Sequence, residues 1–353
     1  MTDDGESAGA ASLGYRRLER RRLLILAGGA CLLALSLLVD LMTGPAAIGP
    51  REILAAVFSP DRATPADRTI VWEFRMTTAV MAAAVGAALG VAGAQMQTIL
   101  NNPLASPYTL GVSSAAGFGA ALAMVCGAGL APLAGPLLVP ASAFFFAALG
   151  SLAIYGIARW RPGSTEGIIL GGVAMMFLFN AGVAFLQFFA REEELAAIVF
   201  WLFGSLQGAT WPKVGVVSSA LGISVALLGA RSWRLTALRL GDERARSMGI
   251  DVGRLRLETL MIVSALTATA VCFTGSIGFI GLVAPHIARG MVGEDQRFLM
   301  PLSAVLGALL LSVASVASKM LLPGAIFPIG VATAIFGVPF FGALIFLKRR
   351  ADW

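Results

Sequence analysis

"LLILAGGACLLALSLLVDL" (residues 23–41) decides the fold class, because it is almost wholly apolar and its only charge, Asp40, lies near its end. A bilayer core of roughly 30 Å takes about 20 apolar residues in a helix. Only helices and closed barrels satisfy the backbone in lipid, and this run lacks the alternation of a barrel strand. It is also too long for the core of a signal peptide. We therefore predict an uncleaved transmembrane helix.

The rest of the chain has the same character. Of its 353 residues, 58% are hydrophobic and 13% are charged, whereas soluble domains carry about twice that charged fraction. Glycine is abundant, and Gly86 and Gly90 in "GAALG" suit close helix packing in a membrane. We predict an all-α fold, a polytopic bundle of about ten transmembrane helices. The expected spans are residues 23–43, 76–98, 108–130, 136–158, 167–190, 212–230, 257–275, 279–290, 299–321 and 328–347.

This arrangement places the basic clusters on one side of the membrane. They include "RRLERRR" (residues 16–22), the segment 231–256 and the last residues of the chain. The positive-inside rule makes that side the cytoplasm, with both termini there, and explains the net charge of +6 without nucleic acid as a partner. We expect residues 1–22 to form a cytoplasmic tail, disordered at its start, and residues 23–350 to form the transmembrane domain. The eighth span is short, so it is tilted, partly re-entrant or buried by its neighbours.

The chain lacks the residues of an enzyme. A phosphate-binding loop needs a Gly-Lys pair, and none of the three lysines follows a glycine. His286 is the only histidine, which excludes a two-histidine metal motif. The three cysteines are scattered and suggest buried apolar groups rather than a metal site. We expect no catalytic residue, no cofactor and no bound metal.

The spans also lack the central charges that ion-coupled carriers use. The charged side chains Asp40, Glu258, Arg289 and Lys319 all fall near predicted span ends. Inside the spans, polar character comes only from uncharged groups such as Gln95 and Gln97. The protein is therefore either a passive pore or a transporter that takes its energy from another subunit.

The densest charge lies in "GDERARSMGIDVGRLR" (residues 241–256). Asp242 and Glu243 would begin a short helix at its positive end, and Gly249 would close it in a left-handed cap. Ala245 and Met248 would form a small apolar face, and "IDVGRLR" would form a second short turn. Two interpretations remain open: a basic loop on anionic lipid headgroups, or a docking element for a protein.

Several blocks together resemble the FecCD-type permease family, the membrane subunits of ABC importers for iron–siderophore complexes, haem and cobalamin. The blocks are "GAALGVAGAQMQTILNNPLASPYTLGVSSAAGFG" (residues 86–119), "WLFGSLQGATW" (201–211), "GDERARSMGI" (241–250), "FTGSIGFIGLVAPHIARGMVGEDQRFLMPLSAVLGA" (273–308) and "PIGVATAIFGVPFF" (328–341). The resemblance implies a type II ABC importer permease fold with ten helices per subunit. Its implied partners are a second permease subunit, two ABC ATPase subunits, an extracytoplasmic substrate-binding protein and membrane lipid.

The resemblance also implies roles for residues. The ATPase-coupling motif matches Gly241, Asp242, Glu243, Arg244, Ala245, Arg246, Met248 and Gly249. The cytoplasmic gate matches Asn102, Leu104, Ser164 and Thr165. The fifth span resembles the family's pathway-lining helix, with Met176, Asn180 and Gln187 toward the channel. Binding-protein docking falls on Arg75 and Lys319, although snorkelling toward the interface is an equal explanation for Lys319.

The chain departs from the family pattern at several positions. Thr77 and Thr78 replace a proline and a second arginine after Arg75, Phe327 precedes Pro328 where glutamate is common, and Gln296 stands where histidine is frequent. His286 matches a recurrent Pro-His pair, for which we expect a structural role. The implied function is inward transport of an iron(III)–siderophore or similar metal chelate across the inner membrane by alternating access. Haem or cobalamin is the alternative cargo, and a stand-alone secondary carrier the alternative mechanism.

Overall fold

A computed structural model gives the fold of the chain. It describes residues 3–46, 48–59, 61, 63–127, 135–160, 165–321 and 327–348, and the side chains of these residues except 3–15, 165, 341 and 343–348. Within these ranges every regular element is helical. The all-α prediction is therefore confirmed.

Each of the ten predicted spans overlaps a helix. These helices are α1 (Asp3–Met42), α4 (Thr77–Ile99), α5 (Val112–Cys126), α7 (Leu138–Trp160), α8 (Thr165–Phe189), α10 (Trp211–Gly229), α13 (Val252–Thr274), α14 (Ile280–Val292), α15 (Gln296–Met320) and α16 (Ile329–Lys348). Among the described residues, seven helices are long and apolar enough to cross a membrane, and α5, α14 and the described part of α16 are shorter apolar helices. Shorter elements connect them: α2 (Pro50–Phe58), α3 (Pro65–Thr69), the π-helical η2 (Ile70–Met76), the 3₁₀ turn η4 (Gly135–Leu137), α9 (Glu192–Leu202), α11 (Ser232–Leu238) and α12 (Asp242–Ser247).

Three boundaries differ from the prediction. The start of the chain, expected to be disordered, is helical from Asp3, because α1 continues the first span backwards. The helix α5 begins only at Val112, after Gly111 with φ +78°. The segment "IDVGRLR" is no separate turn: the Asp251 side chain accepts a hydrogen bond from the Arg254 backbone N–H and so begins α13 at Val252.

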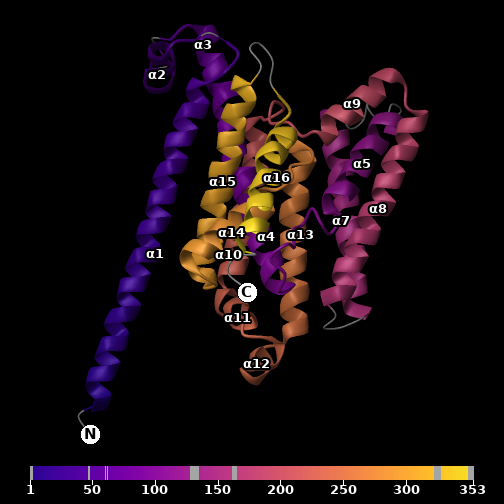
Figure 1. Cartoon of the computed structure of the whole chain (residues 1–353). Helices are drawn as coiled ribbons and strands as arrows, with labels where there is room; N and C mark the ends of the chain where they lie inside the picture. Colours follow the sequence, from indigo (N-terminus) through magenta and orange to yellow (C-terminus); the bar gives the residue numbers. More distant parts are fainter. Residues whose placement is uncertain are drawn as a thin grey trace.

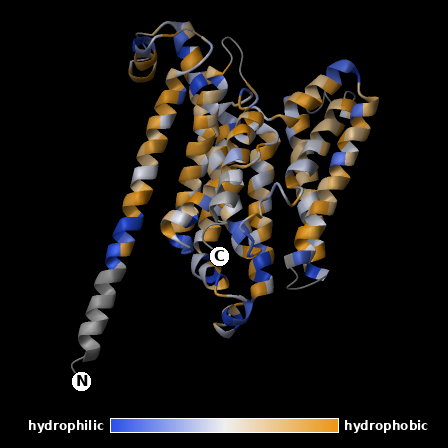
Figure 2. Cartoon of the chain, viewed as in Figure 1, coloured by the Kyte–Doolittle hydropathy of each residue, from blue (hydrophilic) through white to orange (hydrophobic). Residues whose placement is uncertain are grey.

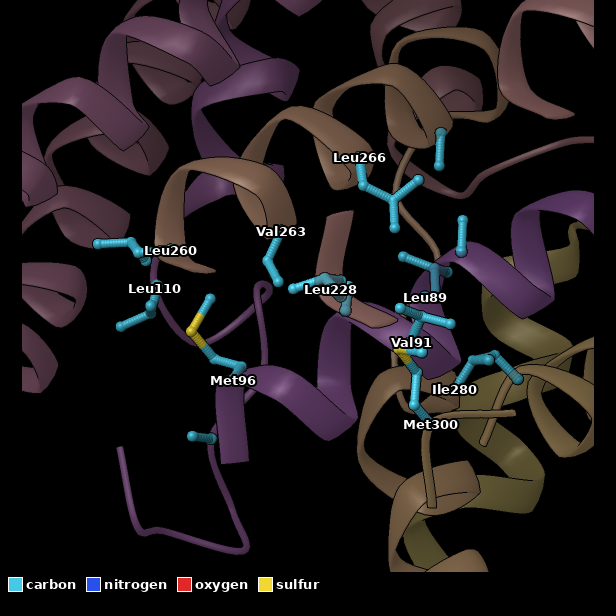
Figure 3. Close-up of a cluster of buried hydrophobic side chains, with 14 of the residues drawn as sticks. Leu89, Val91, Met96, Leu110, Leu228, Leu260, Val263, Leu266, Ile280 and Met300 are labelled. Atoms are coloured by element: carbon cyan, nitrogen blue, oxygen red, sulfur yellow. The ribbon is translucent and has the colours of Figure 1, made fainter. Parts of the chain in front are cut away.

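The helix α4 lies at the centre of the bundle and is buried along almost its whole length. Figure 3 shows its side chains Leu89, Val91 and Met96 among apolar side chains from α10, α13, α14 and α15. It packs most extensively against α15, where a Cβ at Gly86 would overlap the Gly307 carbonyl and a Cβ at Gly90 the Ser303 carbonyl. The predicted role of these two glycines in close packing is thus confirmed.

The short helix α14 is buried by its neighbours, which is one of the three alternatives for the eighth span. It packs on both α4 and α15, and most of one face is buried. Gly93 of α4 and Gly281 of α14 bring the two backbones together, since a Cβ on either would meet the other helix's main chain. A helix too short to cross a bilayer can be held in this way inside protein.

The chain has two polar ends. We call the end that carries α11, α12 and the basic clusters the basic end; its arginines include Arg22, Arg159, Arg231, Arg239, Arg256 and Arg289. Figure 2 shows hydrophilic residues gathered there, at the bottom of the view, with a mostly apolar zone above. The opposite end carries α2, α3 and α9 (Figure 1). In the same view α5, α7, α8 and α9 form a group beside the central helices, and α1 leans away from the bundle toward its start.

Candidate coupling site and its link to the gate turn

The predicted short helix of the charged insert exists as α12 and is closed as expected. The N–H of Gly249, at φ +79°, bonds to the Arg246 carbonyl at 2.9 Å, and the N–H of Ile250 bonds to the Ala245 carbonyl at 3.1 Å. This is the Schellman arrangement, which favours glycine at the left-handed position. Ala245 and Ile250 are both buried. The insert is therefore a well-defined protrusion, visible at the lower tip of Figure 1.

The predicted apolar face of α12 is wrong in one respect. Ala245 is fully buried against the rest of the chain, whereas Met248 is 47% exposed. The two side chains lie on different faces because the left-handed turn at Gly249 directs the chain back toward α13 only after Met248. We call the exposed surface of this segment the α12 face; it consists of Glu243, Arg244, Arg246, Ser247 and Met248. It combines charges of both signs with one apolar side chain.

A buried arginine fixes α12 to the bundle. Arg256, only 8% exposed, donates from its two terminal nitrogens to the two carboxylate oxygens of Asp242, each at 2.8 Å. Its Nε donates to the carbonyl of Ile99, at the end of α4, at 2.8 Å. A bidentate pair of this kind fixes geometry as well as contributing energy. Arg256 therefore connects Asp242 of α12 to the end of the central helix.

The turn after α4, residues 100–111, contains one half of the predicted gate. The Asn102 side-chain oxygen accepts a hydrogen bond from the Leu104 backbone N–H at 2.9 Å, which is an Asx turn. Leu104 is 60% exposed. Asn101 has a positive φ of 46°, a conformation that asparagine tolerates better than most residues. We call this segment the gate turn.

A chain of polar contacts joins the gate turn to α11 and α14. Arg239, just after α11, donates to the Asn101 side-chain oxygen at 2.5 Å and to Glu294 at 2.8 Å. Arg289 of α14 lies 2.9 Å from the same Glu294 oxygen and donates to Gln97 of α4 at 2.8 Å. We call these five residues the polar relay. It connects α4, α11, α14 and the gate turn through one carboxylate.

A second buried set lies beside the relay. The Gln296 amide donates to the Thr98 hydroxyl at 2.8 Å and accepts from the Gln95 amide at 2.9 Å. Its backbone N–H donates to the Thr236 hydroxyl of α11 at 3.1 Å. Both glutamines are fully buried. Gln296, which departs from the family pattern, thus ties the start of α15 to α4 and α11.

The start of α15 is also tied to α1. Asp295 lies 3.5 Å from Arg22 and 2.7 Å from Arg297. Burial acts to raise the pKa of the Asp295 carboxyl, but the hydrogen bonds from Arg297 and the charges of Arg297 and Arg22 outweigh it, so its pKa lies below its usual value. The carboxylate therefore stays charged at neutral pH.

The other half of the predicted gate falls at the edge of the described chain. Ser164 lies outside the described residues, and Thr165 is described only as the first residue of α8. Their role remains a prediction.

The predicted pathway residues lie on α8, which packs against α5 and α7. Asn180 is exposed, and Met176 and Gln187 are half-buried. Large apolar side chains on the same helix are open as well, among them Phe177 at 66% and Phe188 at 82% exposed. This helix thus presents a mixed surface away from the rest of the chain.

The two residues predicted to dock a binding protein are engaged inside the chain. Arg75, 5% exposed, donates to the last carbonyls of α1, at Leu41 (3.0 Å) and Met42 (3.2 Å). Lys319 is paired with the fully buried Asp40 at 2.8 Å, and Ser315 donates to the same carboxylate oxygen. Both side chains join α1 to the bundle at the opposite end.

The described residues contain no group of three or more His, Cys, Asp or Glu side chains placed to hold a metal ion. His286 is half-buried on α14. The important residues that sequence reasoning missed are Arg239, Arg256 and Glu294. The one feature of the sequence that could have indicated these three residues is a charge beside or within an apolar run. An example is "RLRLETL" (residues 254–260), in which Arg256 is the arginine that faces inward.

The comparisons with known proteins agree with this architecture. The FecCD transport family matches residues 32–347. The Fe(3+)-citrate import system permease protein YfmE of Bacillus subtilis is 32% identical over 335 residues, covering 95% of this chain and 98% of that protein. The vitamin B12 import system permease protein BtuC of Vibrio parahaemolyticus is 35% identical over 334 residues, covering 93% and 95%.

A solved structure supports the same assignment. An ABC transporter assigned to the metal-chelate type, in an inward-facing conformation, superposes with a TM-score of 0.79 at 30% identity, covering 91% of this chain and 98% of that one. The family match and these relatives cover nearly the whole chain, including the buried central helix, the gate turn and α12. The chain belongs to the FecCD transport family, the permeases of ABC importers.

Proposed function

We propose that the chain is the permease subunit of an importer that carries an iron(III)–siderophore or similar metal chelate inward across the cytoplasmic membrane. The relatives with iron–citrate and vitamin B12 in their names support cargo of this class, and haem or cobalamin is the second candidate. The basic end faces the cytoplasm in this proposal, as the positive-inside rule favours. Both termini then lie on that side.

One observation carries the proposal: α12 is an exposed projection rigidly connected to the centre of the bundle. Its outer α12 face is free for a partner, while Asp242 on the same helix is held by Arg256, which also binds the end of α4. A solvated loop would need no such connection. We assign the α12 face to docking with an ABC ATPase subunit. The complete importer then contains two ATPase subunits and a second permease, which is a copy or a paralogue of this chain. ATP is hydrolysed on the ATPase subunits and not on this chain.

The polar relay gives the movement a route to the gate turn. Arg239 follows α11 and precedes α12, and it holds Asn101 and Glu294 together. Nucleotide-dependent movement of α12 would change the position of Arg239 and so of the gate turn. Coupling of this kind requires that the ATPase contact α12 differently in its two nucleotide states.

The pathway would form between two permease subunits along α8. Met176, Asn180 and Gln187 lie on this helix, and its exposed apolar side chains would be covered by the second subunit rather than by the chain itself. Leu104 and Asn102 would close the pathway at the cytoplasmic end together with Ser164 and Thr165. An extracytoplasmic binding protein would deliver the chelate at the opposite end.

The test is charge reversal on the α12 face. The permease is purified with the ATPase that accompanies it and reconstituted in liposomes with a loaded binding protein. We expect Arg244→Glu with Arg246→Glu to lower chelate uptake at least about tenfold while ATP hydrolysis continues. The matched control reverses two exposed arginines of the same end that lie outside the insert, Arg17→Glu with Arg20→Glu, and should keep uptake.

Two results would count against the proposal. Undiminished uptake in the α12 variant would remove the coupling role, and accumulation of solute by the chain alone, without nucleotide, would identify a secondary carrier. Parallel assays with a ferric siderophore, haemin and cobalamin identify the cargo. Saturable uptake of haemin or cobalamin alone would favour the second candidate.

A further inference from the structure

A pocket at the basic end borders the coupling site, but most of its lining residues have no role in the proposed transport. It has a volume of about 810 Å³ and lies where the ends of α7 and α10 meet the start of α13. Its charged lining is formed by Arg159, Arg231, Arg254, Arg256 and Glu258. Its apolar lining includes Leu227, Leu260, Met261 and Ile262. The pocket therefore joins a charged rim to an apolar wall.

The charges of the rim are unbalanced. Arg256 is paired with Asp242. Arg231 and Arg254 share one carboxylate, Glu258, at 3.1 and 2.8 Å. No hydrogen bond or ion pair of Arg159 occurs within the described chain, and its side chain is exposed.

Three arginines thus face one carboxylate in the lining. Asp251, outside the lining, is occupied in capping the start of α13. Gly253, in the first turn of α13, is also part of the lining, and the N-terminal end of a helix favours an anion. The rim is consequently suited to a phosphate group.

The depth of the pocket matches that of lipid headgroups. Trp160 directly follows Arg159 and is 88% exposed, and Trp233, two residues after Arg231, is 64% exposed. Exposed tryptophans of membrane proteins concentrate at the membrane–water interface. The apolar residues of the wall belong to α10 and α13, two of the candidate spans, and so continue from the rim into the hydrocarbon zone.

We propose that this pocket binds an anionic phospholipid of the adjacent leaflet. The phosphate and its acidic headgroup are held by Arg159, Arg231 and Arg254, and an acyl chain lies along Leu257 and Met261, two partly exposed residues of the lining one helical turn apart. A zwitterionic lipid fits less well because its cationic headgroup meets the surplus positive charge. Free phosphate would leave the apolar wall without a ligand.

The test measures lipid retention by the purified full chain. Native mass spectrometry follows the chain in detergent with added phosphatidylglycerol or phosphatidylcholine of the same acyl chains. We expect a bound phosphatidylglycerol that phosphatidylcholine displaces only at an excess of at least about tenfold. Arg159→Gln should weaken this preference about fivefold and Arg159→Gln with Arg254→Gln by more, as expected for charges close to a membrane surface. Both side chains are exposed, so these variants keep the fold.

Further variants separate the site from general surface charge. Arg17→Gln, at the same end, and Arg51→Gln, at the opposite end, should retain the lipid as the unaltered chain does. Met261→Trp keeps every charge but fills the apolar wall, and it should also lose the lipid. Equal binding of the two lipids, equal retention by the arginine variants, or displacement of the lipid by millimolar inorganic phosphate would each overturn the proposal.

Discussion

Gly86 and Gly90 show how single residues set the spacing of helices in this protein. In lipid no hydrophobic effect drives helices together, so they associate through close van der Waals contact, which small residues permit. The facing positions on α15 are Gly307 and Ser303, and the backbones meet there. The predicted importance of "GAALG" came from composition alone, whereas its partner on α15 depends on the tertiary fold.

We expect Gly86→Leu to destabilise the chain by about 3 kcal/mol, because overpacking a close interface forces the backbones apart. Thermal unfolding of the purified protein in detergent measures this loss. Gly222→Leu, on α10, is the matched control, since a Cβ at Gly222 meets nothing within 4 Å. Equal unfolding temperatures of the two variants would contradict the close contact of α4 and α15.

The Asp40–Lys319 pair gives a second test at the residue scale. Lys319→Met leaves a fully buried carboxylate without its cation, and removal of one partner of such a pair costs about 3 kcal/mol. Asp40→Asn with Lys319→Met should recover most of that stability. If Lys319 also docks the binding protein, the stable double variant will capture it more weakly. Unchanged capture would restrict Lys319 to its structural role.

Sequence reasoning at this scale succeeded where chemistry is local. Gly249 could be placed as a left-handed cap because the requirement lies in its own backbone. The contacts of Arg75 with the end of α1, of Arg256 with Ile99 and of Lys319 with Asp40 could not be derived, since these partners lie far apart in the chain. Ala245 and Met248 were grouped by helical spacing, but a helix as short as α12 ends before that spacing defines a face.

At the scale of elements, the polar relay is the most informative arrangement. Glu294 accepts a hydrogen bond from Arg239 and forms an ion pair with Arg289, so one carboxylate is shared by two arginines from different elements. Glu294→Gln keeps the shape but removes the charge. We expect uptake to fall about tenfold while the ATPase stays bound, because the α12 face is unaltered. Co-purification measures binding, and uptake by liposomes measures coupling.

Glu192→Gln, on exposed α9 at the opposite end, is the control and should transport normally. Loss of ATPase binding in Glu294→Gln would show that the relay supports the docking surface itself. Unchanged uptake would remove the relay from the coupling route.

Protonation of Asp295 offers a test of the α1–α15 connection. Because the folded-state pKa is lowered, the charged carboxylate contributes stability above its unfolded pKa of about 3.9 and loses that contribution as pH falls through the folded value. Asp295→Asn keeps a good helix cap but no charge. We expect the variant to be about 1 kcal/mol less stable at pH 7, with the difference constant to about pH 4 and vanishing below. Thermal unfolding against pH measures this difference, and a difference that grew on acidification would contradict the assignment.

The existence of a helix at each of the ten predicted spans followed from hydropathy, but the ends of these helices did not. The helix α13 begins several residues earlier than expected because Asp251 caps it. The length of an apolar run matches the thickness of the bilayer core. The helix that contains this run can extend further at either end, until a capping residue stops it. The short helices α2, α3 and α9 are too short to cross a bilayer, so a search for membrane spans does not find them.

At the scale of the whole molecule, the orientation in the membrane is the main prediction. In a background without Cys31, Cys126 and Cys272, we expect Ser247→Cys to be protected from a membrane-impermeant maleimide in intact spheroplasts and labelled in inverted vesicles. Thr64→Cys, at the opposite end, should show the reverse pattern. Labelling of both sites from the same side would refute the ten-span topology, and a reversed pattern would place the basic end outside.

The fold and the family could be predicted from the sequence because ordered motifs extend over most of the chain. The polar contacts that connect the helices could not be predicted, because Gln97, Glu294 and Gln296 acquire their partners only when distant helices meet. The exposed apolar surface of α8 likewise became visible only in three dimensions.

The close packing of α4 against α15 has a consequence for biosynthesis. Gly86 leaves the ribosome long before Gly307 has been translated, so α4 enters the membrane with its glycine face and its two buried glutamines uncovered. Until the ninth span is inserted, nascent α4 must be sheltered by lipid or by an insertase. A transcript that ends before the codon for Gly307 would thus yield a product that membrane proteases can recognise by this open face.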